Sequence, residues 1–114
     1  MKQLTNVLKV LADKNRLRII KLLEKRKMCV CELAPVLGIT QPSTSRHLKK
    51  LKSAGLIEEK QQGFWTDYFL VQPDDAYGKV LLNFIFGWLN DDKVVKGDLE
   101  KSARISRRKL CCGR

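Results

Sequence analysis

The chain has 114 residues, of which 44% are hydrophobic, and its formal net charge at pH 7 is +11. This length allows one compact domain with a modest core, to which a second subunit would add useful burial. No apolar run approaches the roughly 20 residues that cross a bilayer, and the first residues lack a signal-peptide core, so we expect a cytoplasmic protein and no membrane partner.

The basic charge lies at the two ends of the chain. Residues 1–55 carry 13 Lys or Arg against 3 Asp or Glu, residues 56–92 carry 2 against 7, and residues 93–114 carry 8 against 2. A basic block that includes a helix is typical of nucleic-acid binders, because each cation near a phosphate releases condensed counterions. A solvated basic surface is the alternative that charge alone leaves open.

Two short amphipathic helices are predicted first. Apolar residues recur every three or four positions over residues 2–12, as expected for a helix with one buried face. Asp13 has the chemistry of a helix N-cap, and a second helix with Leu17, Ile20 and Leu23 on its apolar side is predicted from residue 14 to about 26.

A third helix is predicted from Cys31 or Glu32 to Leu37. Proline has no N–H and is best tolerated in the first turn of a helix, so Pro35 limits where this helix starts. Gly38 is typical of a helix end. The two thiols of Cys29 and Cys31 lie at its start, and four cysteines in a reducing compartment favour metal binding or thiol chemistry over disulfides.

A fourth helix is predicted over residues 41–54, with Thr40 as its N-cap and Pro42 in its first turn. Leu48 and Leu51 face a core, whereas the rest of the surface is hydroxyl, amide and basic. Two short helices joined by a three-residue turn with glycine, the second polar and basic, indicate a helix-turn-helix.

Two strand-like runs follow, over residues 56–62 and 64–71, and they meet at Gly63. Directly after a helix-turn-helix, such a β-hairpin is expected to be a wing. Its tip, residues 60–66, then lies along the DNA backbone or in the minor groove, although a purely structural hairpin has the same pattern.

The last long helix is predicted over residues 75–90, capped by Pro73-Asp74-Asp75. It is apolar around most of its circumference, so we expect one half in the domain core and the other in a dimer interface beside the first helix. The main apolar stripe is Val80, Leu81, Phe84, Ile85, Trp88 and Leu89, with Leu82 and Phe86 off it. We expect two parts, a domain over residues 1–91 and a basic tail over 92–114 that is mobile or at most a loosely held helix.

Several motifs together resemble the arsenic-repressor (ArsR/SmtB) family of winged-helix transcriptional regulators. The motifs are Cys29-Val30-Cys31-Glu32-Leu33, residues 40–48, Leu51, Ala54-Gly55-Leu56-Ile57, Gly63-Phe64-Trp65 and Tyr68-Phe69-Leu70, and the resemblance covers about residues 5–90. It implies an α+β, mostly α, winged helix-turn-helix with about five helices and a two-stranded hairpin, paired through its first and last helices. It also implies a repressor that leaves its operator DNA when a toxic ion binds.

The resemblance makes residues 41–54 the DNA-reading helix. Candidate base and phosphate contacts in the helix are Gln41, Ser43, Thr44, Ser45, Arg46, His47, Lys49 and Lys50, and those in the wing are Lys60 and Gln62. Arg46 can bind guanine with two hydrogen bonds. His47 could instead pack or cap, and the lysines could simply be solvated. Family members often have arginine in the wing, whereas this chain has Lys60 followed by two glutamines.

Soft thiolates select soft ions, and the resemblance implies trivalent arsenic as inducer, with antimony as its usual companion and no catalytic cofactor. Zinc sensors of the family use His and carboxylates along the last helix, where this chain has Asp only at the ends, and cadmium/lead sensors have another Cys near the N-terminus, which is absent. Arsenic sensors often have a third Cys where this chain has Ala34. A third ligand could come from Cys111 or Cys112, from a small thiol, or be absent.

In a regular helix, residues two apart point about 200° from each other, so Cys29 and Cys31 could not share one small ion there. We therefore expect a ligand to fix a non-helical turn at residues 29–31. The alternatives are a thiol-redox or a cadmium/lead sensor of the same fold, and a DNA-binding protein that ignores metals. An enzyme is not expected, because the sequence has no Cys-x-x-Cys and no Ser/His/Asp set on a plausible cleft.

Overall fold

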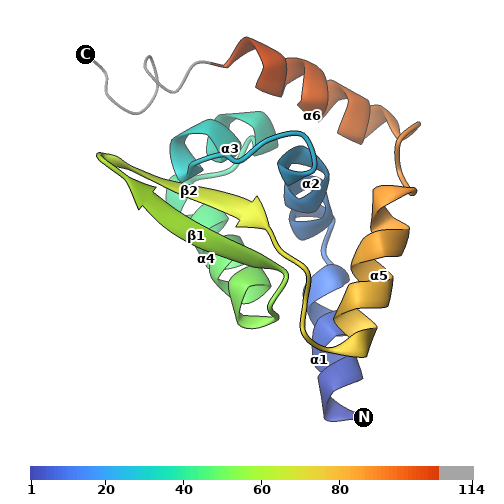
Figure 1. Cartoon of the computed structure of the whole chain (residues 1–114). Coiled ribbons are helices and arrows are strands. Elements are labelled where there is room, and N and C mark those ends of the chain that lie inside the picture. The colour runs from blue at the N-terminus through green and yellow to red at the C-terminus, as the bar shows by residue number, and fades with distance from the viewer. Residues whose placement is uncertain (106–114) are drawn as a thin grey trace.

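The computed structural model describes residues 1–105, which form six helices and one β-hairpin (Figure 1). The elements are α1 (Lys2–Leu11), α2 (Lys14–Leu23), α3 (Val30–Leu37), α4 (Gln41–Ser53), β1 (Ile57–Gln62), β2 (Trp65–Leu70), α5 (Ala76–Phe86) and α6 (Lys93–Arg104). The predicted winged helix-turn-helix is confirmed, with one helix more than expected. No helix among residues 1–105 is long and apolar enough to span a bilayer.

The predicted N-caps explain where three of the helices begin. The side chain of Asp13 accepts a hydrogen bond from the backbone N–H of Arg16, and Thr40 accepts one from Ser43 in the same way. Each cap satisfies one of the donors that the first turn of a helix leaves without a partner. Asp75 does the same for α5. Gly38, at φ 72, ends α3 in the left-handed conformation that lets the chain turn into α4.

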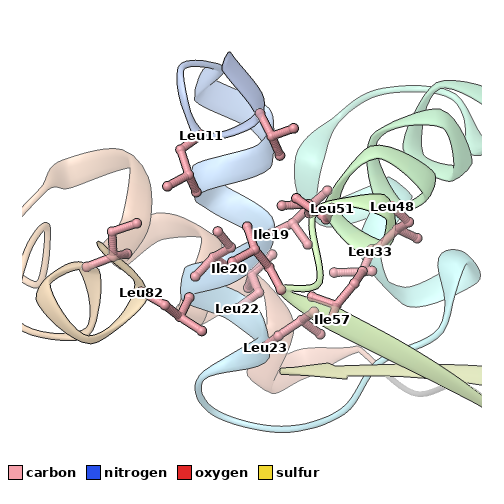
Figure 2. Packing of buried hydrophobic residues seen from close by; sticks show 14 of the residues in the cluster. Leu11, Ile19, Ile20, Leu22, Leu23, Leu33, Leu48, Leu51, Ile57 and Leu82 are labelled. Atoms are coloured by element: carbon pink, nitrogen blue, oxygen red, sulfur yellow. The ribbon is translucent and has the colours of Figure 1, made fainter. Parts of the chain in front are cut away.

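Helix α2 lies at the centre of the core, as Figure 2 shows. Its Ile19, Ile20 and Leu22 are at most 1% exposed, and they pack with leucines and isoleucines from the surrounding helices and from β1. Burial of one such side chain contributes about 1.5–3 kcal/mol. The helix-turn-helix, the wing and α5 are therefore all seated on one central helix.

The wing pairs as predicted, to within one residue at each end. Strands β1 and β2 run antiparallel, from the Ile57–Leu70 pair at the base to the Gln62–Trp65 pair beside the turn. Gly63 has φ 62, a conformation that other residues rarely adopt, and it allows the tight reversal of the chain.

Helix α5 is shorter than predicted, and only part of its apolar surface faces the core. It ends at Phe86, since Gly87 is its C-cap and the buried amine of Lys21 donates to the carbonyls of Ile85 (3.0 Å) and Phe86 (3.4 Å). These bonds satisfy carbonyls that a helix end leaves free. The core residues are Leu82 and Ile85, although Leu82 had been placed off the main stripe.

Three residues of the predicted stripe, Val80 and Phe84 on α5 and Trp88 just after its end, point outward. Val80, Phe84 and Trp88 are 51%, 55% and 52% exposed, and the rings of Phe84 and Trp88 stack with their centroids 5.6 Å apart. Helix α1 lies beside α5 (Figure 1) and exposes Leu8 at 47%. Both helices therefore expose large apolar side chains that no other part of residues 1–105 covers.

Residues 93–104, for which a mobile tail or at most a loosely held helix was expected, form a packed helix. Helix α6 lies across α2 and α3 (Figure 1), and its N-cap Asp92 accepts hydrogen bonds from the backbone N–H groups of Val94 and Val95. Its buried face consists of Val95, Asp98 and Ser102. Two of these three are polar, so the face lacks the apolar period that normally indicates a buried helix.

Candidate nucleic-acid interface and metal centre

Helix α4 presents most of its predicted contact residues to solvent. Gln41, Ser45, Arg46, Lys49 and Lys50 are all exposed, and Leu48 and Leu51 on the opposite side are fully buried. The Nη2 of Arg46 donates to the hydroxyl of half-buried Ser43 at 2.9 Å, one turn earlier. This side of α4 offers hydroxyl, amide and cationic groups, which is the chemistry that base edges and phosphates accept.

Thr44 is not on this surface, which corrects the prediction that it contacts DNA. Its side chain is fully buried, and its hydroxyl donates to the backbone carbonyl of Thr40 at 2.9 Å. Residue 44 lies four positions before Leu48, so it shares the buried side of the helix.

His47 is half-buried between α4 and α2. Its Nδ1 lies 3.2 Å from Nη1 of Arg16 and 4.0 Å from the carboxylate of Asp13. Burial lowers the pKa of His47 below its usual value, helped by the charges of Arg16, Lys50 and Arg46, whereas Asp13 acts in the opposite direction. A neutral imidazole that accepts from Arg16 at Nδ1 makes His47 part of the packing between two helices.

The two predicted contact residues of the wing differ in their exposure to solvent. Lys60 is exposed and Gln62 is half-buried, next to a tip where Phe64 is 86% exposed. Between wing and helix, the amine of Lys52 donates to the carboxylate of Glu59 at 3.1 Å. Lys60 thus remains the wing cation available to a DNA backbone.

The thiol pair lies at the first turn of α3, which begins at Val30, earlier than predicted. Cys29 is the N-cap, with extended backbone (φ −95, ψ 169) and 3% exposure, whereas Cys31 is helical and half-buried. The cap position already leaves the helical path, so the two residues are not held to the 200° separation of a helix interior.

A buried carboxylate holds this turn closed. Glu32 accepts from the backbone N–H of Cys29 at 3.0 Å and from Nη1 of Arg26 at 2.9 Å. Burial alone would raise the pKa of Glu32, but the bond from Cys29 N–H and the Arg26 guanidinium outweigh it, with a smaller contribution from the Cys29 thiol, and lower that pKa below its usual value. Glu32 is therefore an ionised acceptor that also contacts the thiol side chain.

The residue before the pair is connected to the wing and to α6. The backbone N–H and carbonyl of Met28 exchange hydrogen bonds with Tyr68 of β2, at 3.2 and 2.8 Å, and its sulfur accepts from the hydroxyl of Ser102 at 3.9 Å. Arg26 also donates to the carbonyl of Ser102 at 3.2 Å. No sequence pattern had indicated that the cysteine segment touches both elements.

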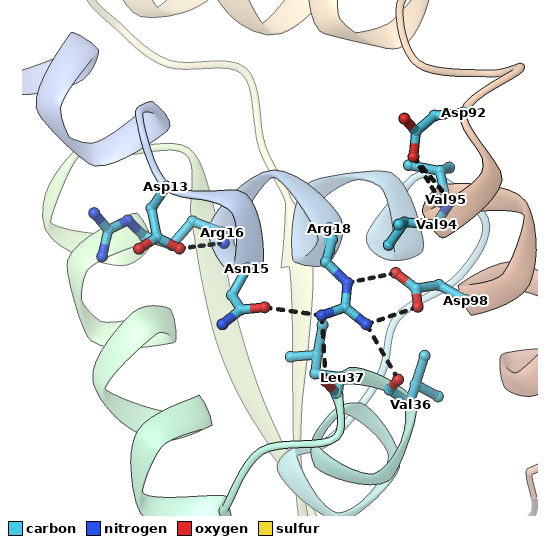
Figure 3. A network of polar contacts seen from close by, with 10 residues as sticks. All are labelled: Asp13, Asn15, Arg16, Arg18, Val36, Leu37, Asp92, Val94, Val95 and Asp98. Carbon is cyan, nitrogen blue, oxygen red and sulfur yellow. Dashed lines mark hydrogen bonds and ion pairs between the residues drawn. The ribbon is translucent and has the colours of Figure 1, made fainter.

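The other end of α3 is tied to α6 by Arg18, as Figure 3 shows. Its guanidinium donates to both carboxylate oxygens of Asp98, at 2.8 and 2.9 Å, and to the carbonyls of Leu37 and Val36, at 3.2 and 3.4 Å. The Asp98 carboxylate in turn raises the pKa of Arg18. One side chain of α2 thus caps the last turn of α3 and binds α6.

The two remaining cysteine candidates, Cys111 and Cys112, lie outside the described residues. Within residues 1–105, no three His, Cys, Asp or Glu side chains come together as a metal site. Cys29 and Cys31 are the two thiols that the described chain brings to one turn.

Comparison with known proteins identifies the family. Residues 13–59, from the start of α2 to the first part of β1, match the model of bacterial regulatory proteins of the arsR family. The chain is 45% identical over 97 residues to the arsenical resistance operon repressor of Escherichia coli, covering 84% of this chain and 81% of the relative. It is 32% identical over 113 residues to the arsenic resistance transcriptional regulator ArsR2 of Pseudomonas putida, covering 94% and 96%.

A solved structure has the same architecture. The homodimeric winged helix-turn-helix domain of Mb0332 from Mycobacterium bovis, described as a possible ArsR-family regulator, superposes with a TM-score of 0.64 at 26% identity, covering 81% of this chain and 82% of that chain. The predicted family and fold are thereby confirmed, and so is the expectation that the chain is not an enzyme. The chain belongs to the arsR family of bacterial regulatory proteins, which are DNA-binding transcriptional regulators.

Proposed function

We propose that this protein is an arsenite- or antimonite-responsive transcriptional repressor, which binds operator DNA as a dimer and is released when the trivalent metalloid binds its cysteine thiolates. The observation that carries the proposal is the position of Cys29 and Cys31, in the turn that begins the helix-turn-helix and follows the bridge to the wing. Similarity to proteins named for arsenic resistance supports arsenic as the inducer.

Cys29 and Cys31 supply two of the ligands. Each As–S bond that forms on arsenous acid releases one water, because the thiol proton leaves with a hydroxide. Cys111 or Cys112, or a small-molecule thiol, supplies the third sulfur, because trivalent arsenic takes three soft ligands and position 34 is alanine.

Ligand binding acts first on Glu32. The Cys29 thiol helps to hold the Glu32 carboxylate, and an As–S bond removes the S–H that makes this contact. Drawing Cys31 towards the same ion as Cys29 also pulls on the first turn of α3, where Pro35 offers no N–H to the Cys31 carbonyl. The cap opens and α3 moves.

This movement reaches both DNA-binding elements. Helix α3 leads through Gly38-Ile39-Thr40 into α4, and Met28 is hydrogen-bonded to β2. A shift at residues 29–31 therefore changes the angle between α4 and the wing. Two elements that must meet one duplex together lose affinity when their spacing changes.

On DNA, the exposed side of α4 enters the major groove. Ser45 and Arg46 are the leading base contacts, Gln41 and Ser43 contact bases or phosphates, and Lys49 and Lys50 contact the backbone. In the wing, Lys60 and Gln62 contact the backbone or the minor groove. Exposure of most of these side chains supports this assignment, and the burial of Thr44 removes it from the set.

The dimer forms through the apolar face of α1 and α5. A second copy of the chain would cover Leu8, Val80, Phe84 and Trp88, which are each about half exposed in one chain. Such a pairing places two recognition helices on one duplex, in register with an inverted repeat.

The test is fluorescence anisotropy of a labelled duplex, selected by the protein from a random pool, under strong reductant. Arsenite and antimonite should release the wild-type protein, whereas zinc should not. Cys29→Ser and Cys31→Ser should bind the duplex with unchanged affinity and resist release. If Cys111→Ser or Cys112→Ser alone resists release by arsenite, the replaced cysteine is the third ligand. If both single variants and the double variant respond as the wild-type protein does, a small thiol supplies the third sulfur.

Two results would replace the proposal. Release by peroxide but not by arsenite would make the same thiols a redox sensor, since partly exposed Cys31 stands in a basic region. Release by cadmium or lead at lower concentration than by arsenite would make the chain a sensor of those ions. If arsenite releases Cys29→Ser from the duplex as readily as the wild-type protein, the proposed metalloid site is wrong.

A further inference from the structure

A surface groove lies between α1 and the second half of α4. It is lined by Asn6, Lys9 and Val10 from α1, by Lys49, Lys50 and Ser53 from α4, and by Arg16 of α2. We call this the α1–α4 groove. Four of its lining residues carry a positive charge, and none carries a negative one.

Within the described part of the chain, residues 1–105, no carboxylate pairs with the lysines of the groove. Among residues 1–105, the ion pairs within 4 Å engage Lys21 and Lys52 but not Lys9, Lys49 or Lys50. Like charges gathered on one surface repel, and the repulsion is relieved when an anion binds between them.

Arg16 holds α1 and α4 together, so the groove is already formed without a ligand. Its Nε donates to the carbonyl of Val10 at 2.5 Å and its Nη2 to that of Lys9 at 3.3 Å, while Nη1 contacts His47 of α4. Because Arg16 is only 8% exposed, it fixes the end of α1 against α4 and adds a buried positive charge beneath the lysines.

A second groove beside α4, which shares Lys49 and Ser53 with the first, differs in charge. It lies between α4 and the wing and is lined by Ser45, Lys49, Lys52, Ser53, Glu59 and Tyr68, with Lys52 neutralised by Glu59 at 3.1 Å. A helix in the major groove has a phosphate strand on each side of it. The side of α4 towards α1 is therefore the more favourable for a polyanion.

We propose that the α1–α4 groove binds the phosphate backbone of the DNA strand next to the recognition helix, and that Lys9 of α1 is a DNA contact. This rests on the proposed function, because it takes α4 as the helix that enters the major groove. Lys49 and Lys50 hold the strand from one side and Lys9 from the other. The contact is to phosphate, so it strengthens binding to every sequence and specifies none.

The test compares Lys9→Gln with a matched loss of charge. Lys96→Gln is the control, because Lys96 is exposed on α6, which packs on α2 and α3. In anisotropy titrations over a range of salt, Lys9→Gln should weaken binding by the proposed dimer about tenfold at low salt. It should also reduce the slope of log K against log salt by about 1.8, because each of the two chains loses one phosphate contact. The loss should be equal on a selected duplex and on a random one, and Lys9→Arg should restore it.

The outcomes separate this proposal from the proposed function. If the wild-type protein binds no duplex, both fail. If it binds and Lys9→Gln behaves as Lys96→Gln does, the groove proposal alone is overturned. Lys9 also lies in the last turn of α1, where a cation stabilises the helix end. A lower melting temperature of Lys9→Gln with unchanged salt slope would assign it that structural role instead.

Discussion

Replacing Asp98 by alanine should destabilise the protein much more than its position near the end of the chain suggests. The carboxylate is 5% exposed and accepts two hydrogen bonds from Arg18, whose side chain is 15% exposed. Removing one partner of a buried pair costs about 3–5 kcal/mol when the remaining charge is left uncompensated. Arg18 keeps neutral acceptors on Asn15, Val36 and Leu37, so we expect about 2–3 kcal/mol for Asp98→Ala.

The assay is urea unfolding followed by circular dichroism, at one protein concentration for all variants because a dimer gains stability with concentration. Glu100→Ala is the control, since it removes the same charge from an exposed position of α6. It should change the free energy of unfolding by less than about 0.5 kcal/mol. If Asp98→Ala and Glu100→Ala agree within that margin, the Arg18 contact does not hold α6 in place.

Three further perturbations probe other parts of the fold. Lys21→Met should lower the free energy of unfolding in urea by about 1–3 kcal/mol, because the carbonyls at the end of α5 lose their donor. If the same substitution at an exposed lysine lowers it as much, Lys21 does not cap α5. Folding lowers the pKa of His47, mainly through burial, so the folded state favours the neutral ring. The contribution of His47 to the free energy of unfolding is therefore complete above about pH 6.5 and is lost as the pH falls below that value. The wild-type protein should therefore lose stability relative to His47→Gln in that window, and parallel pH profiles of the two proteins would show that folding does not lower the pKa of His47. Phe84→Lys should halve the mass seen in sedimentation equilibrium without unfolding the chain, and an unchanged mass would place the dimer interface elsewhere.

Local rules were enough to predict the core of the architecture. Side-chain caps at Asp13, Thr40 and Asp75 and the glycines at 38 and 63 depend on residues a few positions apart, and the structure has each of them where the sequence indicated. The two strand-like runs around Gly63 likewise predicted the wing, whose strands begin and end within one residue of the expected bounds.

Two features were not predicted, the packing of α6 and the burial of Thr44 on α4, because both depend on residues far away in the sequence. On the buried face of α6, the Asp98 carboxylate accepts from Arg18 and the backbone carbonyl of Ser102 accepts from Arg26, about 80 positions earlier in the chain. On α4, the rotation about the helix axis decides which polar residues face DNA. That rotation follows from how Leu48 and Leu51 seat on the core, which buries Thr44 with them.

The backbone bridge between Met28 and Tyr68 joins the residue before Cys29 to the wing, so the two proposed ligands, metalloid and DNA, would affect each other's binding through this contact. If metalloid binding at Cys29 lowers affinity for DNA by a given factor, thermodynamic reciprocity requires that bound DNA lower affinity for the metalloid by the same factor. Repressor on its operator is then a weaker metalloid binder than repressor free in solution. A cell holding many more copies than operators would fill the free pool first, so the number of copies sets the metalloid concentration at which transcription begins.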